Sequence, residues 1–527
     1  MKLRPHSRST ALAAAGASAL LLITACGGPS AAQSTEHALI DPALSTEQIA
    51  DLSEEAFYWG LNIAGYYELR HVFTELEGQP AYRGINRVQP QLNLFDAKTR
   101  YATTVNASTL YSGGAFDISD DPIVVETPAV TDGRYWSVQA TDQNVECFFK
   151  AGSQFTGNAP QRYLIVGPDW KGKLPSGFRG TEIIRASSNS FTLAVRVAVT
   201  TRDEQDMAAA RQTVTGVLAA PLAQWEANGG KVPPLDQQPV VKGAYRTFPR
   251  MDQISDIGKS MTPIDYLQLL SLSINDPSLT RRTDSVKETD TLDRLAKLGL
   301  REGTIFEPEE VSAEQKAAIE DGFTRARREA KDAFESSQVD MNGWRLQSSL
   351  FFDDLDYVAK AGADDVAWGT PVPYESHTIA YVFDDSEGRP LEGKYDYTLT
   401  FDVNELPPTT EFWELPVYDS AGYFIDNPVN RYSATSELLK AGDYAVVDGK
   451  LTFYLQPERP TDPEQARNWL PTAPSDGFQL AARFYGPTAG LIDGGYAMPR
   501  IVRSGGWSAQ ARRGCRGGPS SRCRALD

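Results

Sequence analysis

Cysteine and histidine are scarce in this chain. Its 527 residues include four of each, and Cys147 is the one cysteine away from the two ends of the sequence. A regular, even-numbered set of cysteines is missing, which excludes a small fold stapled by disulfides. So few histidines exclude a histidine-rich metal centre. We expect Cys147 to be a small buried apolar residue rather than a reactive thiol.

The common catalytic motifs are missing as well. The sequence has no G-x-S-x-G elbow, no P-loop, no H-E-x-x-H and no C-x-x-C pair. His377 is a candidate general base, but the neighbouring Ser376 would point to the opposite face of a strand, so the two do not form a dyad. The acidic runs at 353–356 and 384–385 are interpreted as solvated loops rather than Ca²⁺ or Mg²⁺ ligands. The sequence therefore predicts no cofactor and no metal, and leaves open whether the protein is an enzyme.

Positive charge is in deficit. The chain has 51 basic and 69 acidic residues, a formal net charge of −18, and five of its arginines follow Ala511 near the end. An acidic surface repels phosphate backbones. We therefore expect no nucleic-acid partner.

The amino terminus has an apolar run that is too short to span a membrane. The run extends over Ala11–Thr24 and follows a basic segment, and its last two residues begin the stretch Ile23-Thr24-Ala25-Cys26. This stretch resembles the lipobox of bacterial lipoproteins. The resemblance implies cleavage before Cys26 and lipid attachment to its thiol, with the membrane as partner. We expect a signal peptide at 1–25, a flexible tether at 26–44, and an exported protein anchored by lipid to the cell membrane or outer envelope. The alternatives are an exported protein in which Cys26 is incidental, and an internal translation start.

A long helix is predicted to follow the tether. Ser45 and Gln48 can form a capping box, and apolar residues then recur at steps of three and four as far as Phe73. Arg70 falls on the same stripe, where an unpaired guanidinium would be costly. Arg70 therefore either ties this helix to a neighbouring domain or faces a polar cavity.

Three further regions follow residue 100. Short strands of period two, separated by Gly and Pro turns, predict a first β-sandwich over 101–202, after a helix and connection over 45–100. Residues 203–344 predict a mostly helical connector, with a second capping box at Ser312 and Gln315. Alternating strands return over 345–503, and 504–527 is an Arg-, Gly- and Cys-rich tail that we expect to be disordered. The predicted fold class is multidomain and mainly β, with a helical domain.

Several motifs in order resemble a bacterial two-module family, domain of unknown function 1254 followed by domain of unknown function 1214. The motifs of the first half are Tyr58-Trp59-Gly60, Asn106–Ser112, Gly133–Gln139 and Tyr163–Pro175; those of the second are Leu406-Pro407-Pro408, Asn430–Ser433, Asn468–Pro471 and Arg483-Phe484-Tyr485. The resemblance implies an immunoglobulin-like sandwich, a helical domain and a jelly-roll-like sandwich, and no general activity. Where the family pattern has Asp, this chain has Ser108, and Val105 replaces a Pro.

The polar residues of these motifs, with Arg70, are the candidate site. They either brace turns and the domain interface, or converge in a cleft between the sandwiches that binds a small-molecule or glycan ligand. The binding hypothesis gives an envelope lipoprotein with a carbohydrate-like ligand; a hydrolase or lyase using scattered Asp, Glu and Tyr, and a structural envelope scaffold, are the alternatives. The candidate residues are Arg70, Asn106, Tyr111, Arg134, Tyr135, Gln139, Arg431, Tyr432, Asn468, Arg483 and Tyr485.

Overall fold

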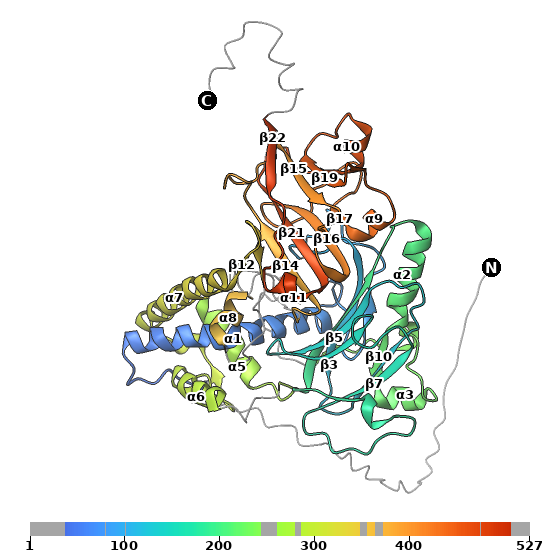
Figure 1. The fold of residues 1–527 in the computed structure, drawn as a ribbon. Coiled ribbons are helices and arrows are strands. Elements are labelled where there is room, and N and C mark those ends of the chain that lie inside the picture. The colour runs from blue at the N-terminus through green and yellow to red at the C-terminus, as the bar shows by residue number, and fades with distance from the viewer. Residues whose placement is uncertain are drawn as a thin grey trace, which may run out of the picture.

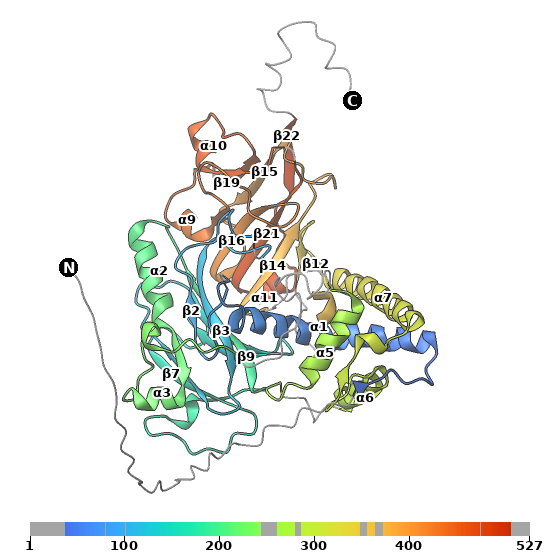
Figure 2. The same cartoon turned by 180° about the vertical axis from the view of Figure 1, so that it is seen from behind.

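The chain folds into two β-sandwiches and a helical unit that lies beside both (Figures 1 and 2). This architecture comes from a computed structural model that describes residues 37–79, 81–100, 102–243, 261–279, 286–347, 356–363, 373–474 and 476–506. It confirms the predicted class, multidomain and mainly β with helical parts. Cys26, the signal peptide and the tail from 507 lie outside the described residues.

The first sandwich consists of a five-stranded and a four-stranded sheet. Trp136, Val138, Phe191 and Val195 lie in the core of this sandwich, because every second residue of β5 and β9 points inward. The five-stranded sheet has the order β2 (Gln89–Pro90), β3 (Thr109–Asp117), β9 (Ser190–Ala198), β5 (Trp136–Asp142), β6 (Cys147–Gly152). The other has the order β10 (Leu218–Pro221), β4 (Ile123–Thr127), β7 (Gln161–Val166), β8 (Ile183–Arg185).

The first sandwich continues beyond the expected boundary at residue 202. Strand β10 pairs with β4, and helices α2 (Glu204–Gly216) and α3 (Leu222–Ala227) contribute Val214 and Trp225 to buried clusters of this unit. The sequence of α2 is charged and helical, which is typical of a connector. Its buried side nevertheless covers the sandwich, and the four residues of β10 are too few to give a period-two signal.

The second sandwich pairs a six-stranded sheet with a five-stranded one. Leu399, Phe453, Trp413 and Phe484 fill the core between them. The six-stranded sheet has the order β12 (Val339–Asp340), β13 (Arg345–Leu346), β14 (His377–Val382), β21 (Phe478–Pro487), β16 (Thr409–Asp419), β17 (Ser433–Thr435). The other has the order β18 (Val446–Val447), β19 (Lys450–Gln456), β15 (Tyr395–Asp402), β22 (Ile501–Gly506), with β20 (Trp469–Pro471) beside β19. Short helices α9 (Ser436–Lys440), α10 (Pro463–Arg467) and α11 (Ala489–Ile492) lie in its connections.

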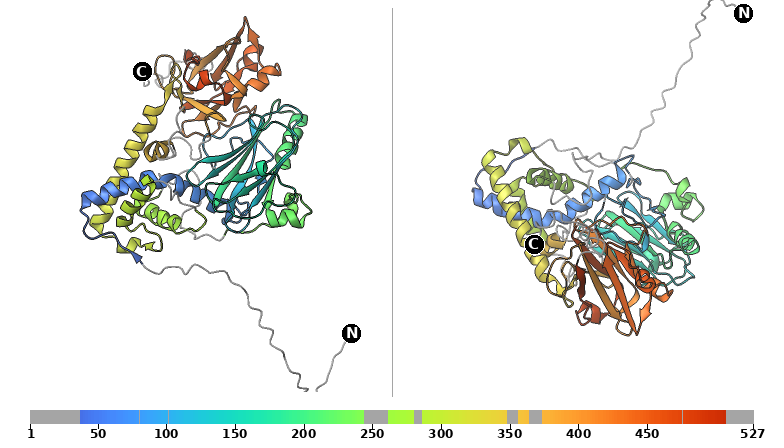
Figure 3. Two further views of the ribbon diagram at one scale, coloured as in Figure 1. Left: turned by 60° about the horizontal axis from the view of Figure 1, so that its bottom comes forward. Right: turned by 90° about the horizontal axis from the view of Figure 1, so that it is seen from above.

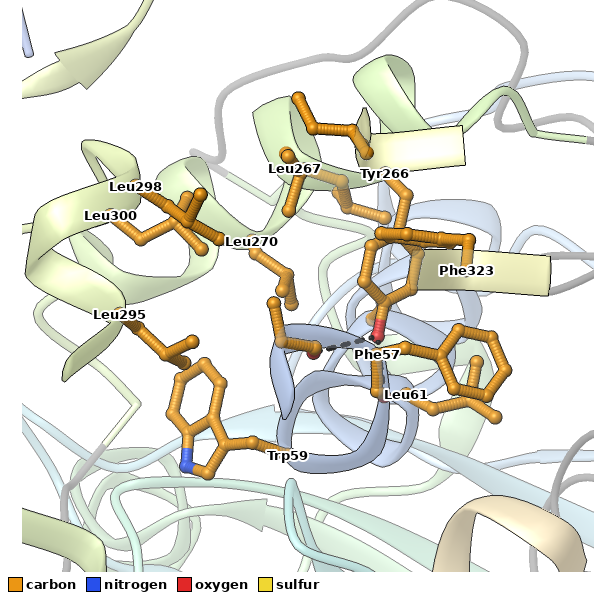
Figure 4. Close-up of a cluster of buried hydrophobic side chains, with 14 of the residues drawn as sticks. Phe57, Trp59, Leu61, Tyr266, Leu267, Leu270, Leu295, Leu298, Leu300 and Phe323 are labelled. Carbon is orange, nitrogen blue, oxygen red and sulfur yellow. Dashed lines mark hydrogen bonds between the residues drawn. The ribbon is translucent and has the colours of Figure 1, made fainter. Parts of the chain in front are cut away.

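The helical unit combines the N-terminal helix with the central part of the chain (Figure 3). Phe57, Tyr266 and Phe323 pack together in its core, where the Tyr266 hydroxyl donates to the Phe57 carbonyl over 3.0 Å (Figure 4). Both predicted capping boxes are present, at Ser45 and Ser312. Its helices are α1 (Thr46–Thr74), α5 (Pro263–Ile274), α6 (Val286–Leu295), α7 (Ala313–Ser337) and α8 (Tyr357–Gly362). Within the described ranges no helix is long and apolar enough to cross a membrane.

The predicted tether at 26–44 and the predicted tail at 504–527 are each ordered at one end. Strand β1 (His37–Ala38) pairs with β11 (Ile305–Phe306), and Ile40 is buried in the core of the helical unit, so residues 37–44 are not tether. Strand β22 likewise reaches Gly506, inside the expected tail. Backbone pairing fixes both segments in place, and residues 37–44 also contribute Ile40 and Leu44 to the apolar core of the helical unit.

Candidate functional site

The two sandwiches meet face to face through their larger sheets. Tyr135, just before β5, and Gln139 within it point away from the core that holds Trp136 and Val138. In β21, Tyr485 points away from the core of the second sandwich. The outward side chains of β3, β5 and β9 therefore lie against those of β14, β16 and β21. We call this set the inter-module layer; it consists of Asn106, Tyr111, Tyr135, Gln139, Arg196, Ser376, His377, Phe412, Glu414, Arg483 and Tyr485.

Hydrogen bonds cross this layer from one sandwich to the other. Gln139 accepts from the Arg196 guanidinium at 2.7 Å and donates to the Ser376 hydroxyl at 2.6 Å. Asn106 donates through its amide to the Tyr485 hydroxyl. The backbone N–H of Ala107 donates to Glu414 Oε1 at 2.9 Å. These buried polar groups satisfy one another across the boundary.

Aromatic stacking seals the layer. The Tyr485 ring lies between Phe412, with centroids 4.1 Å apart, and His377, with centroids 5.2 Å apart. Tyr485 and Glu414 are fully buried. Burial raises the pKa of Tyr485, and burial together with the nearby Arg196 and Arg483 charges lowers the pKa of His377, so His377 is neutral at pH 7. Most side chains of the layer are buried and contact one another, so the layer forms a closed brace between the sandwiches.

Six of the eleven predicted residues meet in this layer. They are Asn106, Tyr111, Tyr135, Gln139, Arg483 and Tyr485. The sequence suggested that Arg and Tyr side chains converge at the module boundary. These six side chains do meet there, but five are buried and Tyr111 is half-buried. Their arrangement matches the bracing interpretation.

Arg70 lies elsewhere and serves as a tie. Its guanidinium forms an ion pair with Asp276 and donates to Ser190 at 2.9 Å and Ser278 at 2.8 Å. Because Ser190 belongs to β9, this cluster joins α1 to the first sandwich. Of the two predicted roles, the tie is the one that these contacts support.

Three more predicted residues brace turns. Arg134 pairs with Asp132 and Asp206, at 2.7 and 3.1 Å. Arg431 donates to the carbonyl oxygens of residues 467 and 469, at 2.7 and 3.0 Å. The Asn468 side-chain amide accepts from the N–H of residue 445 and donates to its carbonyl, both at 2.8 Å. None of the three side chains needs a ligand to satisfy its hydrogen bonds.

One predicted residue, Tyr432, lines an open cavity at the edge of the layer. This cavity, which we call the inter-module cleft, has a volume of about 540 Å³. It adjoins the layer through Phe95, whose ring lies 5.4 Å from that of Tyr111. Residues 94–100 and Ala107, which precede β3, form one side, and the loop before β17 forms the other. The lining residues are Leu94, Phe95, Asp96, Ala97, Lys98, Arg100, Ala107, Arg202, Asp426, Asn430 and Tyr432.

Three cations and two acids line the inter-module cleft. Lys98 is exposed and makes no ion pair with any described residue. Arg100 lies 3.6 Å from Asp419, outside the cleft lining. Arg202 donates to the Ser433 hydroxyl at 2.9 Å, which connects the two sandwiches. The cleft thus has an excess of positive charge on a chain of strongly negative charge.

The second side of the cleft offers neutral polar groups. The Tyr432 hydroxyl donates to Asn430 Oδ1 at 3.2 Å, and burial raises the pKa of Tyr432, so its phenol stays protonated. Asp96 and Asp426 lie near this hydroxyl, one from each half of the chain. Carboxylate, amide and phenol groups around one cavity can bind hydroxyl groups, and the cations can bind an acid.

Sequence reasoning misses most of the cleft. Lys98, Arg100 and Arg202 lie outside the motifs, in loops without period, and the alternating charges of Asp96, Lys98 and Arg100 are the one available signal. This signal is weak, because alternating charges in a loop are equally typical of a solvated surface.

Three other expectations concern single residues or metals. The interpretation of 384–385 as a solvated loop is wrong for Asp385, which is 2% exposed and is paired with Arg389 and Arg503. Cys147 is partly rather than fully buried, and desolvation raises the pKa of its thiol to about 11, which disfavours the reactive thiolate. Among the described residues no cluster of three His, Cys, Asp or Glu residues can hold a metal.

Comparisons with known proteins identify both modules. Residues 85–221 match the family described as protein of unknown function DUF1254, and residues 376–489 match protein of unknown function DUF1214. The first match ends at Pro221, the last residue of β10. No curated protein matches this sequence.

Two crystal structures are similar. The VPA0106 protein from Vibrio parahaemolyticus is 21% identical with a TM-score of 0.60, over 86% of this chain and 100% of its own. An uncharacterised protein from Burkholderia cenocepacia is 11% identical with a TM-score of 0.39, over 87% of this chain and 93% of its own. The Vibrio structure supports the fold and says nothing about the site. The chain is a two-module protein in which a DUF1254 module precedes a DUF1214 module.

Proposed function

We propose that this protein is an exported envelope lipoprotein that binds a small, carbohydrate-like ligand with an acidic group in the inter-module cleft. The observation that carries the proposal is the charge of the cleft, where Lys98, Arg100 and Arg202 gather between the two modules of an acidic protein. Pockets at domain boundaries are common ligand sites, and 540 Å³ is a usual volume for one.

The lining chemistry selects the ligand class. Arg202 and Lys98 attract a carboxylate, while Asp96 and Asp426 disfavour ligands of high negative charge. The amide N–H groups of Asn430 can donate to sugar hydroxyls, and the two carboxylates can accept from them. A singly charged sugar acid can bind these groups together, whereas a neutral sugar leaves Lys98 without an anionic partner.

The anchoring half of the proposal rests on Cys26. Acyl chains on its thiol would hold the protein at a membrane surface. Strand β1 attaches the N-terminal end of the described chain to the helical unit, through β11. The cleft lies at the boundary of the two sandwiches, so an anchor at this end leaves the cleft open to ligand.

The binding experiment uses D-glucuronate and D-glucose as probes with calorimetry. We expect D-glucuronate to bind the wild-type protein more tightly, and Lys98→Met to weaken it about tenfold, the loss of one charged contact. Lys450→Met is the matched control, because Lys450 is exposed and pairs with Asp402 on the far sheet. Equal affinity for both probes, or equal loss in both variants, would contradict the proposal.

Anchoring is tested separately by fractionation. The Cys26→Ala variant should move from the membrane fraction to the soluble fraction. If it stays with membranes like the wild type, lipidation of that thiol is wrong. This result does not bear on the cleft, so the two halves of the proposal fail independently.

A hydrolase is the second candidate, because Asp96 and Asp426 line one cleft from the two halves of the chain. Two carboxylates across a sugar are the usual requirement for cleaving a glycosidic bond. Incubation with an oligosaccharide that carries a single glucuronate residue should then release shorter products, and both Asp96→Asn and Asp426→Asn should abolish release. Binding without any product would favour the binding protein.

A further inference from the structure

A second cavity lies where the helical unit meets the second sandwich. It has a volume of about 490 Å³ and lies between the C-terminal end of α7, the hairpin of β12 and β13, and the start of β22. We call it the hairpin pocket. The residues that matter are Asp340, Asn342, Arg345, Asp384 and Arg500.

The rim of the hairpin pocket is firmly built. Asn342 and Gly343 turn the hairpin with positive φ angles of 60° and 90°. The Asn342 amide donates to the Met498 carbonyl at 2.9 Å, and Arg500 Nε donates to Asn342 Oδ1 at 3.3 Å. Trp344 is fully buried behind the turn, with its indole N–H bonded to the Pro499 carbonyl at 2.9 Å. The pocket is therefore formed before any ligand binds.

Two opposite charges in this pocket have no partner of their own. Neither Arg345 nor Asp384 makes a side-chain hydrogen bond or an ion pair with a described residue, although both line the cavity. The Arg345 guanidinium lies 5.8 Å from the centre of the Phe383 ring. Asp385 differs, because Arg389 and Arg503 neutralise it at 2.9 and 3.3 Å.

The remaining charged groups are only partly used. Asp340 accepts the Gly343 N–H through Oδ1 at 2.6 Å, which leaves its second oxygen for a ligand. Arg500 is engaged through Nε, which leaves its terminal nitrogens. The cavity thus presents guanidinium donors and carboxylate acceptors together.

We propose that the hairpin pocket binds a small zwitterion, a basic α-amino acid or its close relative. Arginine forks such as those of Arg345 and Arg500 match a carboxylate bidentately. Asp340 and Asp384 supply the acceptors that an ammonium or guanidinium group needs. The excess of acid in the lining, which also includes Glu335, favours a ligand with more positive than negative charge. This site is independent of the inter-module cleft.

L-arginine and agmatine are the probes, measured by calorimetry on the full chain. Agmatine lacks the carboxylate, so it should bind at least tenfold more weakly than L-arginine. Asp384→Asn should weaken both ligands. Arg345→Lys, which keeps the charge and loses the fork, should weaken L-arginine and leave agmatine unchanged.

Matched controls separate the pocket from general effects. Asp402→Asn removes a partly exposed carboxylate of β15 that does not line the hairpin pocket, and it should leave L-arginine affinity unchanged. Lys98→Met in the inter-module cleft should also leave L-arginine affinity unchanged. The hairpin-pocket proposal and the cleft proposal can therefore fail independently. The proposal is overturned if L-arginine shows no saturable binding up to about 10 mM, or if Arg345→Lys weakens both ligands alike.

Discussion

The inter-module layer and the inter-module cleft occupy one boundary between the sandwiches, yet they differ in every property that decides function. The layer holds residues of the family motifs, such as Asn106 and Tyr485, sealed and bonded to one another. The cleft takes its cations from outside those motifs; Lys98 is exposed, Arg202 is half-buried, and they are only partly paired. Polar residues within a motif therefore need not form a binding site, because holding two modules in register also requires defined hydrogen bonds.

The largest effect is expected for Glu414→Ala in the layer. Glu414 is fully buried, accepts the Ala107 N–H, and is the cross-strand neighbour of Arg483. Its loss leaves the buried Ala107 N–H without an acceptor and opens a cavity in a fully buried site, which together should cost about 3 to 5 kcal/mol of unfolding free energy. Urea denaturation measures this cost.

The control for that change is Glu392→Ala. Glu392 lies in the same sandwich, is 44% exposed, and pairs with Lys394 at 3.0 Å. An exposed pair contributes less than about 1 kcal/mol. If both variants lose stability equally, the layer is not the sealed brace described above.

A pH effect should come next in size. Burial and two nearby arginines lower the pKa of His377 below its usual 6.5 in the folded state. Below about pH 6.5 the unfolded chain therefore binds a proton at His377 that the folded chain does not bind. The free energy of unfolding then falls as the pH drops, by up to about 1.4 kcal/mol per pH unit. His377→Phe keeps a ring beside Tyr485 and should lose this part of the slope.

The measurement is urea denaturation of both proteins between about pH 5 and pH 8, the range in which an ordinary histidine titrates. Stability at the upper end of this range serves as the internal reference, because His377 is neutral there in both states. Identical slopes for the wild type and His377→Phe would mean that His377 titrates alike in the folded and unfolded chain.

Removal of a single hydroxyl should have a smaller effect. Tyr485→Phe deletes the acceptor of the Asn106 amide and keeps the ring stacked on Phe412. An unpaired buried donor costs about 1 to 3 kcal/mol. Tyr454→Phe, on the outer sheet, is the matched control and should be nearly neutral; equal losses would place the effect outside the layer.

The sequence predicts the buried faces of the two sandwiches well and the inter-module cleft poorly, for a physical reason. Period-two patterns report burial on one face of a strand, so the inward positions of Trp136 and Phe484 follow from the alternation of their strands. Capping boxes report local hydrogen bonds, so Ser45 and Ser312 are predictable as helix starts. Which outward faces meet depends on the packing of whole sandwiches, which local patterns do not encode.

The cleft escapes prediction for a related reason. Lys98 and Arg202 belong to loops of the first module that are far apart in the sequence, and the pairing of β3 with β9 brings these loops to the same end of one sheet. Docking of the second module then adds Asp426 and Asn430 to the cavity. Tyr432 is a motif residue, and its place beside the cleft is a consequence of that docking. Arg70 stands out in the sequence because a charge on an apolar helix stripe requires a partner, yet spacing does not identify Asp276 as that partner.

The smallest expected effect on stability is that of Lys98→Met. This variant distinguishes the inter-module cleft from the inter-module layer most directly, because it should change ligand binding and not stability. Lys98 is exposed and unpaired among the described residues, so its replacement should change the unfolding free energy by less than about 0.5 kcal/mol. The same change should weaken D-glucuronate binding, and the wild-type affinity should fall as salt screens the cleft. Layer variants should show the opposite pattern, with lost stability. A Lys98→Met protein that unfolds easily would mean that the cleft, too, is part of the brace.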